Sequence, residues 1–232
     1  MIEVTPLDDL GRMETDWLSA RFHFSFADYM DPARVHFGPL RVWNDDLFRP
    51  GGGFPMHPHR DMEIITYIRG GAISHEDSLG NGGRTAVGDV QVMSAGTGIV
   101  HSEFNSEDEN LELFQIWIFP DRKGLTPRWE PRRFTGAARA GALLALVSGN
   151  WEDPDVLHIH QDATLLAADL DAGQAVTHIL EAERRAYMVP PRGAVEVNGV
   201  AAPPRAGIAI TGETEVHIRA TEAAEVVLLD LP

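Results

Sequence analysis

Two short pairs of histidine and glutamate residues are the groups in this chain best suited to chemistry. The first pair is His57 and His59, and the second is His101 and Glu103. Residues i and i+2 of a β-strand point to the same face of a sheet, so each pair would aim two ligands at one point. Three neutral imidazoles and one carboxylate suit a divalent first-row metal and leave positions open for water or substrate. We therefore predict one metal site in the N-terminal half.

The spacing of a third acidic residue, Glu63, leaves its role open. Glu63 follows His59 by four residues, so both side chains would share a face if one strand runs through them. It could then be a further ligand, a catalytic base or a group that supports the ligands. The run His75-Glu76-Asp77 is expected to form a hydrogen-bonded turn near the site.

Short strands separated by glycine turns are expected to position these residues. Runs rich in β-forming residues occur at 90–93, 113–119 and 225–229, and glycine turns occur at 51–53, 70–71, 80–83 and 198–199. Many short strands at close spacing are typical of an all-β sandwich or barrel. Glycines also precede each ligand pair, and they let the backbone bend tightly and approach a ligand closely.

A weak internal repeat divides the chain. The strand-turn-strand pattern of residues 67–92 recurs at 187–210, and the residues between these segments include a stretch rich in proline, glycine and charge. Two copies of one β-module are the simplest interpretation. We predict an N-terminal metal-binding domain over residues 1–125 and a C-terminal domain over residues 126–232.

The second half contains its own His-x-His pair, His158 and His160. No second pair matches it, and residues 207–212 carry no ligand-type residue where the counterpart of His101 would fall. The C-terminal domain is therefore expected to be free of metal.

The amino-acid composition limits the kinds of partner and the cellular compartment that we expect for this protein. The 232 residues include no cysteine, which excludes disulfides and thiolate metal sites. The net charge of −16 repels phosphate backbones, so we expect no direct binding to nucleic acid. No apolar run approaches the roughly 18 residues that span a membrane, and the N-terminus lacks the pattern of a secretory signal. We expect a cytoplasmic protein with no membrane partner.

The chain closely resembles the pirin family over residues 36–130. The resemblance is carried by His57-Pro58-His59-Arg60-Asp61-Met62-Glu63, Gly70-Gly71, His75-Glu76-Asp77-Ser78, Gly88-Asp89-Val90-Gln91-Val92-Met93, Ala95-Gly96-Thr97-Gly98-Ile99 and His101-Ser102-Glu103. It implies an all-β chain of two cupin (jelly-roll-like) β-barrels, with one metal in the N-terminal barrel. The pirin ligands map to His57, His59, His101 and Glu103. In ordinary cupins the glutamate ligand would be Glu63, which the resemblance keeps near the metal.

The same resemblance implies an enzyme, a metal-dependent quercetin 2,3-dioxygenase that cleaves a small aromatic flavonol with O2. The implied cofactor is one divalent metal: Fe(II) in the cell, with Zn, Ni, Co, Mn or Cu as alternatives. Glu103 or Glu63 would be the catalytic base that takes the proton of the flavonol 3-hydroxyl. The alternative function is an iron-binding, redox-sensing regulator that acts through a protein partner. The residues themselves show neither a flavonol pocket nor a partner surface.

Overall fold

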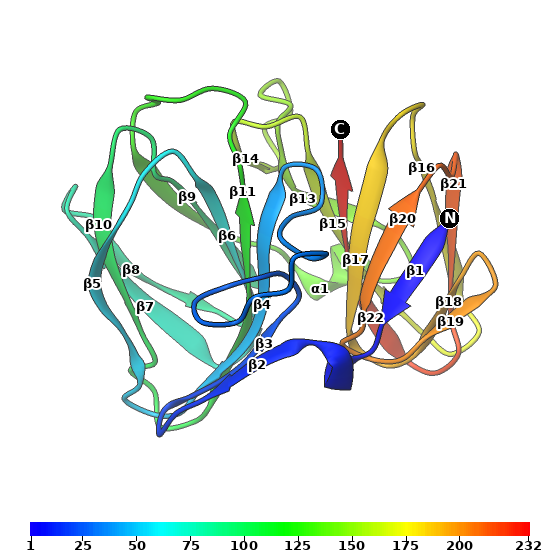
Figure 1. Cartoon of the computed structure of the whole chain (residues 1–232), viewed down its shortest axis with the longest axis horizontal. Coiled ribbons are helices and arrows are strands. Elements are labelled where there is room, and N and C mark those ends of the chain that lie inside the picture. Colours follow the sequence, from blue (N-terminus) through cyan, green and yellow to red (C-terminus); the bar gives the residue numbers. More distant parts are fainter. The chain divides into compact units, whose positions relative to one another are not determined.

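The computed structural model describes all residues 1–232 and consists almost wholly of β-strands (Figure 1). Helical structure is limited to one turn of α-helix, α1 (Gly136–Arg139), and a 3-10 turn, η1 (Leu7–Asp9). Neither could cross a membrane. The strands form two compact units. We call residues 11–134 with 157–161 the N-terminal unit, and residues 1–10, 135–156 and 162–232 the C-terminal unit. The all-β prediction is confirmed.

The N-terminal unit contains a large and a small antiparallel sheet. The large sheet runs in the order β12 (Arg128–Arg133), β9 (Asp89–Ser94), β6 (Glu63–Gly70), β11 (Leu111–Ile118), β4 (Leu40–Phe48), β3 (Leu18–Phe22), β2 (Gly11–Glu14). The small sheet runs β5 (Gly53–His59), β10 (Ile99–Phe104), β7 (Ala72–Asp77), β8 (Gly82–Ala86). The short strand β14 (Leu157–His158) belongs to the same unit.

The C-terminal unit repeats this arrangement of one large and one small sheet, with the strands in the same spatial order. Its large sheet contains, in order, β1 (Ile2–Thr5), β20 (Gly207–Thr211), β17 (Arg185–Arg192), β22 (Ala224–Leu231), β15 (Thr164–Leu170) and β13 (Leu144–Ser148). Its small sheet runs β16 (Ala175–Ile179), β21 (Glu215–Ala220), β18 (Val195–Val197), β19 (Val200–Ala202). In this alignment β9 corresponds to β20, β6 to β17, and the ligand-bearing strands β5 and β10 to β16 and β21. The prediction of two copies of one β-module is confirmed.

The compact units do not coincide with the expected division between residues 125 and 126. The N-terminal strand β1 pairs with β20, Ile2 lying opposite Ile210, so residues 1–10 belong to the C-terminal unit (Figure 1). Strand β12 pairs with β9, which extends the N-terminal unit to Phe134. Residues 157–161 return to that unit and carry His158 and His160 with them. The first two differences come from long-range strand pairings, which local composition does not reveal.

The two interiors are filled differently. Strand β21 alternates exposed residues with the buried Val216, Ile218 and Ala220, which join one large apolar cluster. The corresponding strand β10 buries Ile99, His101 and Glu103 instead. The N-terminal unit therefore contains two smaller apolar clusters and a group of buried polar side chains. This difference in alternate residues puts the candidate site in the N-terminal unit.

Gly53 allows β5 to lie close to β10. A Cβ at Gly53 would lie 2.3 Å from the carbonyl oxygen of Glu103 and 2.6 Å from the Cα of Phe104. Both are backbone atoms, so a side chain would push the two strands apart. We expect Gly53→Ala to lower the free energy of unfolding by about 1–3 kcal/mol, measured by denaturant unfolding. Gly82→Ala, whose Cβ would have its nearest contact at 3.6 Å, is the control. Equal losses in the two variants would contradict this explanation.

Candidate metal centre

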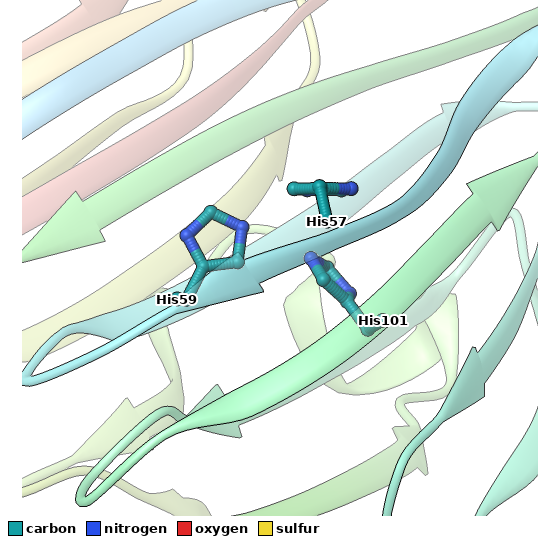
Figure 2. Close-up of side chains that lie close together, drawn as sticks. All are labelled: His57, His59 and His101. Atoms are coloured by element: carbon teal, nitrogen blue, oxygen red, sulfur yellow. The ribbon is translucent and has the colours of Figure 1, made fainter.

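The pairing of β5 with β10 brings the three predicted histidines together. His101 lies opposite His57 in antiparallel register, and His59 lies two residues further along β5. The ring centroids of His57 and His101 are 4.4 Å apart, and His59 lies 4.8 Å and 4.9 Å from them. Figure 2 shows the three rings gathered above the two strands. One ring nitrogen from each lies within 4.8 Å of the others, so the group could hold one ion.

Glu103 lies in the same cavity but is not a member of this three-histidine group. The register of β10 shifts between His101 and Glu103, which marks a β-bulge or irregularity. Both residues are buried, and the Glu103 carboxylate groups with the nitrogens of His101 and His75 within 4.8 Å. The structure thus places Glu103 beside one of the three histidines and brings in His75 as a further neighbour.

Three side chains hold the Glu103 carboxyl group. Gln115 donates to Oε2 at 2.6 Å, and Gln91 donates to Oε1 at 2.9 Å. The hydroxyl of Thr66 donates more weakly to Oε1 at 3.5 Å. Burial raises the pKa of Glu103 to about 7, although these hydrogen bonds favour the ionised form. At neutral pH the group can therefore either hold or release a proton.

The tautomer of His57 follows from its hydrogen bond to the backbone. Its Nδ1 lies 2.8 Å from the carbonyl oxygen of Pro55, and a carbonyl oxygen can only accept. Nδ1 therefore carries the proton, and Nε2 keeps a lone pair. Histidine ligands of metals commonly donate their other ring N–H in this way, which fixes the ring and its tautomer.

A second chain of hydrogen bonds sets the tautomer of His101. The Asp77 carboxylate accepts from His75 Nε2 at 3.2 Å, and His75 Nδ1 lies 3.5 Å from His101 Nδ1. A neutral His75 that donates to Asp77 can only accept at Nδ1, so the proton between the two rings belongs to His101. Nε2 of His101 is then an unprotonated nitrogen, and it is buried with no hydrogen-bond partner. The ring of His75 is held by stacking on Trp129 at 4.6 Å.

Asp77 is itself firmly held in the ionised form. Its Oδ1 accepts from the backbone N–H groups of Leu79 and Asn81, and its Oδ2 accepts from the Asn81 side-chain amide. Burial would raise the pKa of Asp77, but the hydrogen bonds from Asn81, His75 and Leu79 lower it overall. His75 and Asp77 lie on strand β7 and not in the expected turn. The turn begins only after Asp77, at Ser78 and Leu79.

Two histidines of the group, His59 and His101, are suited to stay neutral. Burial, followed by the proximity of His57, lowers the pKa of His59 to about 4. Burial also lowers the pKa of His101, and the neighbouring histidines add to the effect. Unprotonated imidazole is the form that binds a metal. Together with the unpaired Nε2 of His101, this makes the donor set a good fit to one divalent ion.

A cavity of about 140 Å³ opens beside these residues. It is lined by Phe26, Asn44, Asp46, Phe54, His57, His59, Ile64, His101, Glu103, Gln115 and Trp117. Sequence reasoning missed Asn44, Asp46 and Gln115. Burial, together with the charges of Asp45 and Glu103, raises the pKa of Asp46 well above its ordinary range. The one signal in the sequence is the polar run 44–46 inside an otherwise apolar strand.

The structure places Glu63 outside this cavity. A turn at residues 60–62 ends β5 after His59, so Glu63 begins the next strand and does not share a strand with His59. On β6 the adjacent Ile64 lines the cavity, and alternation turns Glu63 to the opposite face. Its Oε2 accepts a hydrogen bond from the Ser94 hydroxyl at 2.7 Å. The expectation that Glu63 lies near the metal stays a prediction, and its side chain does not line the cavity beside the three histidines.

Comparison with known proteins agrees with this arrangement. Residues 5–118 match the family Pirin, and residues 145–231 match the family described as the quercetinase C-terminal cupin domain. The two β-barrels are thus cupin domains, and the chain is a bicupin protein. More particularly, the chain belongs to the pirin family.

Relatives of this family match the whole chain. A Pseudomonas aeruginosa protein with a provisional quercetin 2,3-dioxygenase name is 56% identical over 231 residues, which cover 100% of both chains. A protein named quercetin 2,3-dioxygenase from Escherichia coli is 43% identical, covering 100% of this chain and 99% of that one. The crystal structure of the bacterial pirin YhhW in complex with nickel(II), from Escherichia coli, gives a TM-score of 0.94 at 41% identity, covering 100% and 99% of the two chains.

The hydrogen-bond chain to His101 predicts that Asp77→Asn weakens metal binding by about 10- to 100-fold. An asparagine amide can donate to His75 Nε2, which would move the His75 proton to Nδ1 and reverse the bond to His101. His101 would then carry its proton on Nε2, the atom needed by the metal. Titration calorimetry with Ni(II) measures the change, and Asp108→Asn on the exposed surface is the matched control. Wild-type affinity in Asp77→Asn would refute the tautomer assignment.

The ionisation of Glu63 predicts that the stability of the folded protein depends on pH. Burial raises its pKa from 4.5 to about 7. Between these values the unfolded chain loses a proton that the folded chain keeps, so rising pH lowers the free energy of unfolding. The loss is complete above pH 7 and amounts to about 3 kcal/mol.

Glu63→Gln removes this ionisation and keeps an acceptor for Ser94. We expect the variant to match the wild type near pH 4.5 and to be more stable by up to about 3 kcal/mol at pH 8. Urea unfolding of the chelator-treated proteins measures the difference. If the two stability curves run parallel from pH 4.5 to 8, Glu63 does not have a raised pKa.

Proposed function

We propose that this protein is a metal-dependent dioxygenase that cleaves a flavonol such as quercetin with O2 in the cytoplasm. The observation that carries the proposal is the buried, unpaired Nε2 of His101, which belongs to a group of three histidines beside an apolar cavity. The names of the relatives support the same reaction. The flavonol and O2 are the proposed substrates.

The proposed ligands are His57, His59, His101 and Glu103. Nitrogen and oxygen donors without sulfur suit Fe(II), Ni(II), Co(II), Mn(II), Cu(II) or Zn(II), and we propose Fe(II) in the cell. A nickel(II) complex of a pirin of the same fold supports a site for a divalent metal. When bound, such an ion supplies a Lewis acid that stabilises a deprotonated substrate oxygen.

The apolar wall of the cavity orients the substrate and excludes water. Phe26, Phe54 and Ile64 contribute apolar surface, and Trp117 packs edge-on against His59 at 4.9 Å. A cavity of about 140 Å³ is close to the roughly 150 Å³ that holds one benzene ring. One ring system of a flavonol would therefore enter, and the remainder would lie toward the partly exposed rim at His57.

Glu103 is the proposed proton acceptor for the substrate hydroxyl. Burial raises the pKa of Glu103 in the metal-free protein, so its carboxylate is a good proton acceptor once it moves off the metal. Gln115 and Gln91 keep the two oxygens in place by hydrogen bonds. Glu63 faces the other side of β6, so we do not assign it a catalytic role.

The decisive experiment measures carbon monoxide released from quercetin by protein loaded with each of Fe(II), Ni(II), Co(II), Mn(II) and Cu(II). We expect release with at least one metal, and loss of both metal and release in His57→Ala and His101→Ala. Glu103→Gln keeps an oxygen ligand but no base, so it should keep some metal and lose about 100-fold in turnover. His36→Ala, at an exposed position on the same unit, is the control.

Elemental analysis distinguishes a wrong ligand assignment from a wrong reaction. Full metal content in both histidine variants would refute the ligand assignment. Metal bound by the wild type without any carbon monoxide release would refute the dioxygenase. A regulator or an enzyme with another substrate would then remain, and for a regulator the binding of a protein partner should differ between Fe(II)- and Fe(III)-loaded protein.

A further inference from the structure

Three polar side chains form one part of the cavity wall that no ligand assignment uses. Asn44 and Asp46 lie two residues apart on β4 and so share a face, and Gln115 on β11 lies directly opposite Asn44. All three line the cavity. Their exposed fractions are only 4%, 3% and 6%. They are thus built into the wall, away from bulk water.

Each of these side chains presents a buried oxygen without a hydrogen-bond partner. The atoms are Oδ1 of Asn44, Oδ1 of Asp46 and Oε1 of Gln115. A rotation that exchanged the oxygen and nitrogen of the Gln115 amide would break a hydrogen bond, because the NH2 group donates to Glu103 at 2.6 Å. The neighbouring Arg69 forms its ion pair with Asp45, and Asp46 takes part in no ion pair. Its carboxyl group keeps an acceptor oxygen in either protonation state.

Unpaired buried acceptors are rare because each destabilises the folded protein by about 1–3 kcal/mol. Three of them at one cavity indicate a ligand that brings hydrogen-bond donors. The apolar walls and the volume of the cavity select a single aromatic ring, as argued above. The combined chemistry is an aromatic ring that carries hydroxyl groups on its edge. Trp117 adds one unpaired N–H at the same cavity, which matches an acceptor on the ligand.

We propose that Asn44, Asp46 and Gln115 form an acceptor subsite that binds the hydroxyl groups of a polyhydroxylated aromatic ring. This inference rests on the proposed function for the site and names what selects its substrate. Asp46 contributes most, because its carboxyl group makes no hydrogen bond or ion pair within the protein. The subsite explains why polar oxygens are kept at positions where leucine would stabilise the barrel.

The test measures binding of catechol and of fluorobenzene to the full-length, chelator-treated protein by calorimetry. Without metal, the hydroxyl groups can bind only to the cavity wall, which includes the histidines and Glu103, so the Asp46 variant decides which part of the wall binds them. We expect catechol to bind at least tenfold more tightly than fluorobenzene. Asp46→Leu should remove this preference and raise the unfolding temperature, since leucine has no unpaired acceptor. Asp108→Leu on the surface should leave the preference unchanged.

A purely structural role for Asp46 predicts the opposite, a lower unfolding temperature with catechol preference retained. Asn44→Leu is the second variant, and it should also weaken catechol binding. If neither variant folds, the oxygens are needed by the fold and the subsite is refuted. If the wild type shows no preference for catechol, the subsite is likewise refuted.

The outcomes also separate this inference from the proposed function. Catechol preference that depends on Asp46, without carbon monoxide release from quercetin, would support the subsite and refute the dioxygenase. Carbon monoxide release with an Asp46→Leu variant of unchanged KM for quercetin would support the dioxygenase and refute the subsite.

Discussion

The antiparallel register of β5 against β10 is the constraint on which the candidate metal centre depends. It sets His57 opposite His101. Because side chains alternate, a slip of one residue would turn the ligands of one strand to the other face of the sheet. The absence of a side chain at Gly53 lets the two backbones approach, and the irregularity after His101 is where Glu103 leaves the simple register. Affinity for a metal is thus determined first by backbone pairing and only then by side-chain chemistry.

Hydrogen bonds make this arrangement chemically specific. His57 is oriented by a backbone carbonyl, and His101 by His75 and Asp77, so the structure fixes which nitrogen stays free on each ring. The same kind of burial that lowers the pKa of His59 and His101 raises the pKa of Glu103. Buried polar groups of this kind cost stability, and the N-terminal unit contains smaller apolar clusters than its counterpart. A ligand that pairs the unsatisfied atoms would recover part of that loss.

Much of this could be predicted from the sequence, and the failures have definite causes. The i, i+2 spacing was sufficient for His57 and His59, because a strand converts that spacing directly into a shared face. That His101 joins them depends on the register of β10 against β5. The same spacing argument wrongly placed Glu63 on one strand with His59, since nothing in the spacing marked the turn at residues 60–62. Asp46 was missed because the polar run 44–46 has no matching pair of ligand-type residues elsewhere to mark it as part of a site. The pairing of β1 with β20 was also missed, because it joins residues about two hundred positions apart.

The C-terminal unit shows how little of the chemistry belongs to the fold. Its strand order is the same, yet the strand that corresponds to β10 is β21, and not residues 207–212 as the sequence suggested. The inward positions of β21 are Val216, Ile218 and Ala220, which complete an apolar core. Changing a few alternate residues therefore converts a packed barrel into a barrel with a candidate metal centre, while the ladder of backbone hydrogen bonds is kept. Selection for function can act on those positions almost independently of the fold.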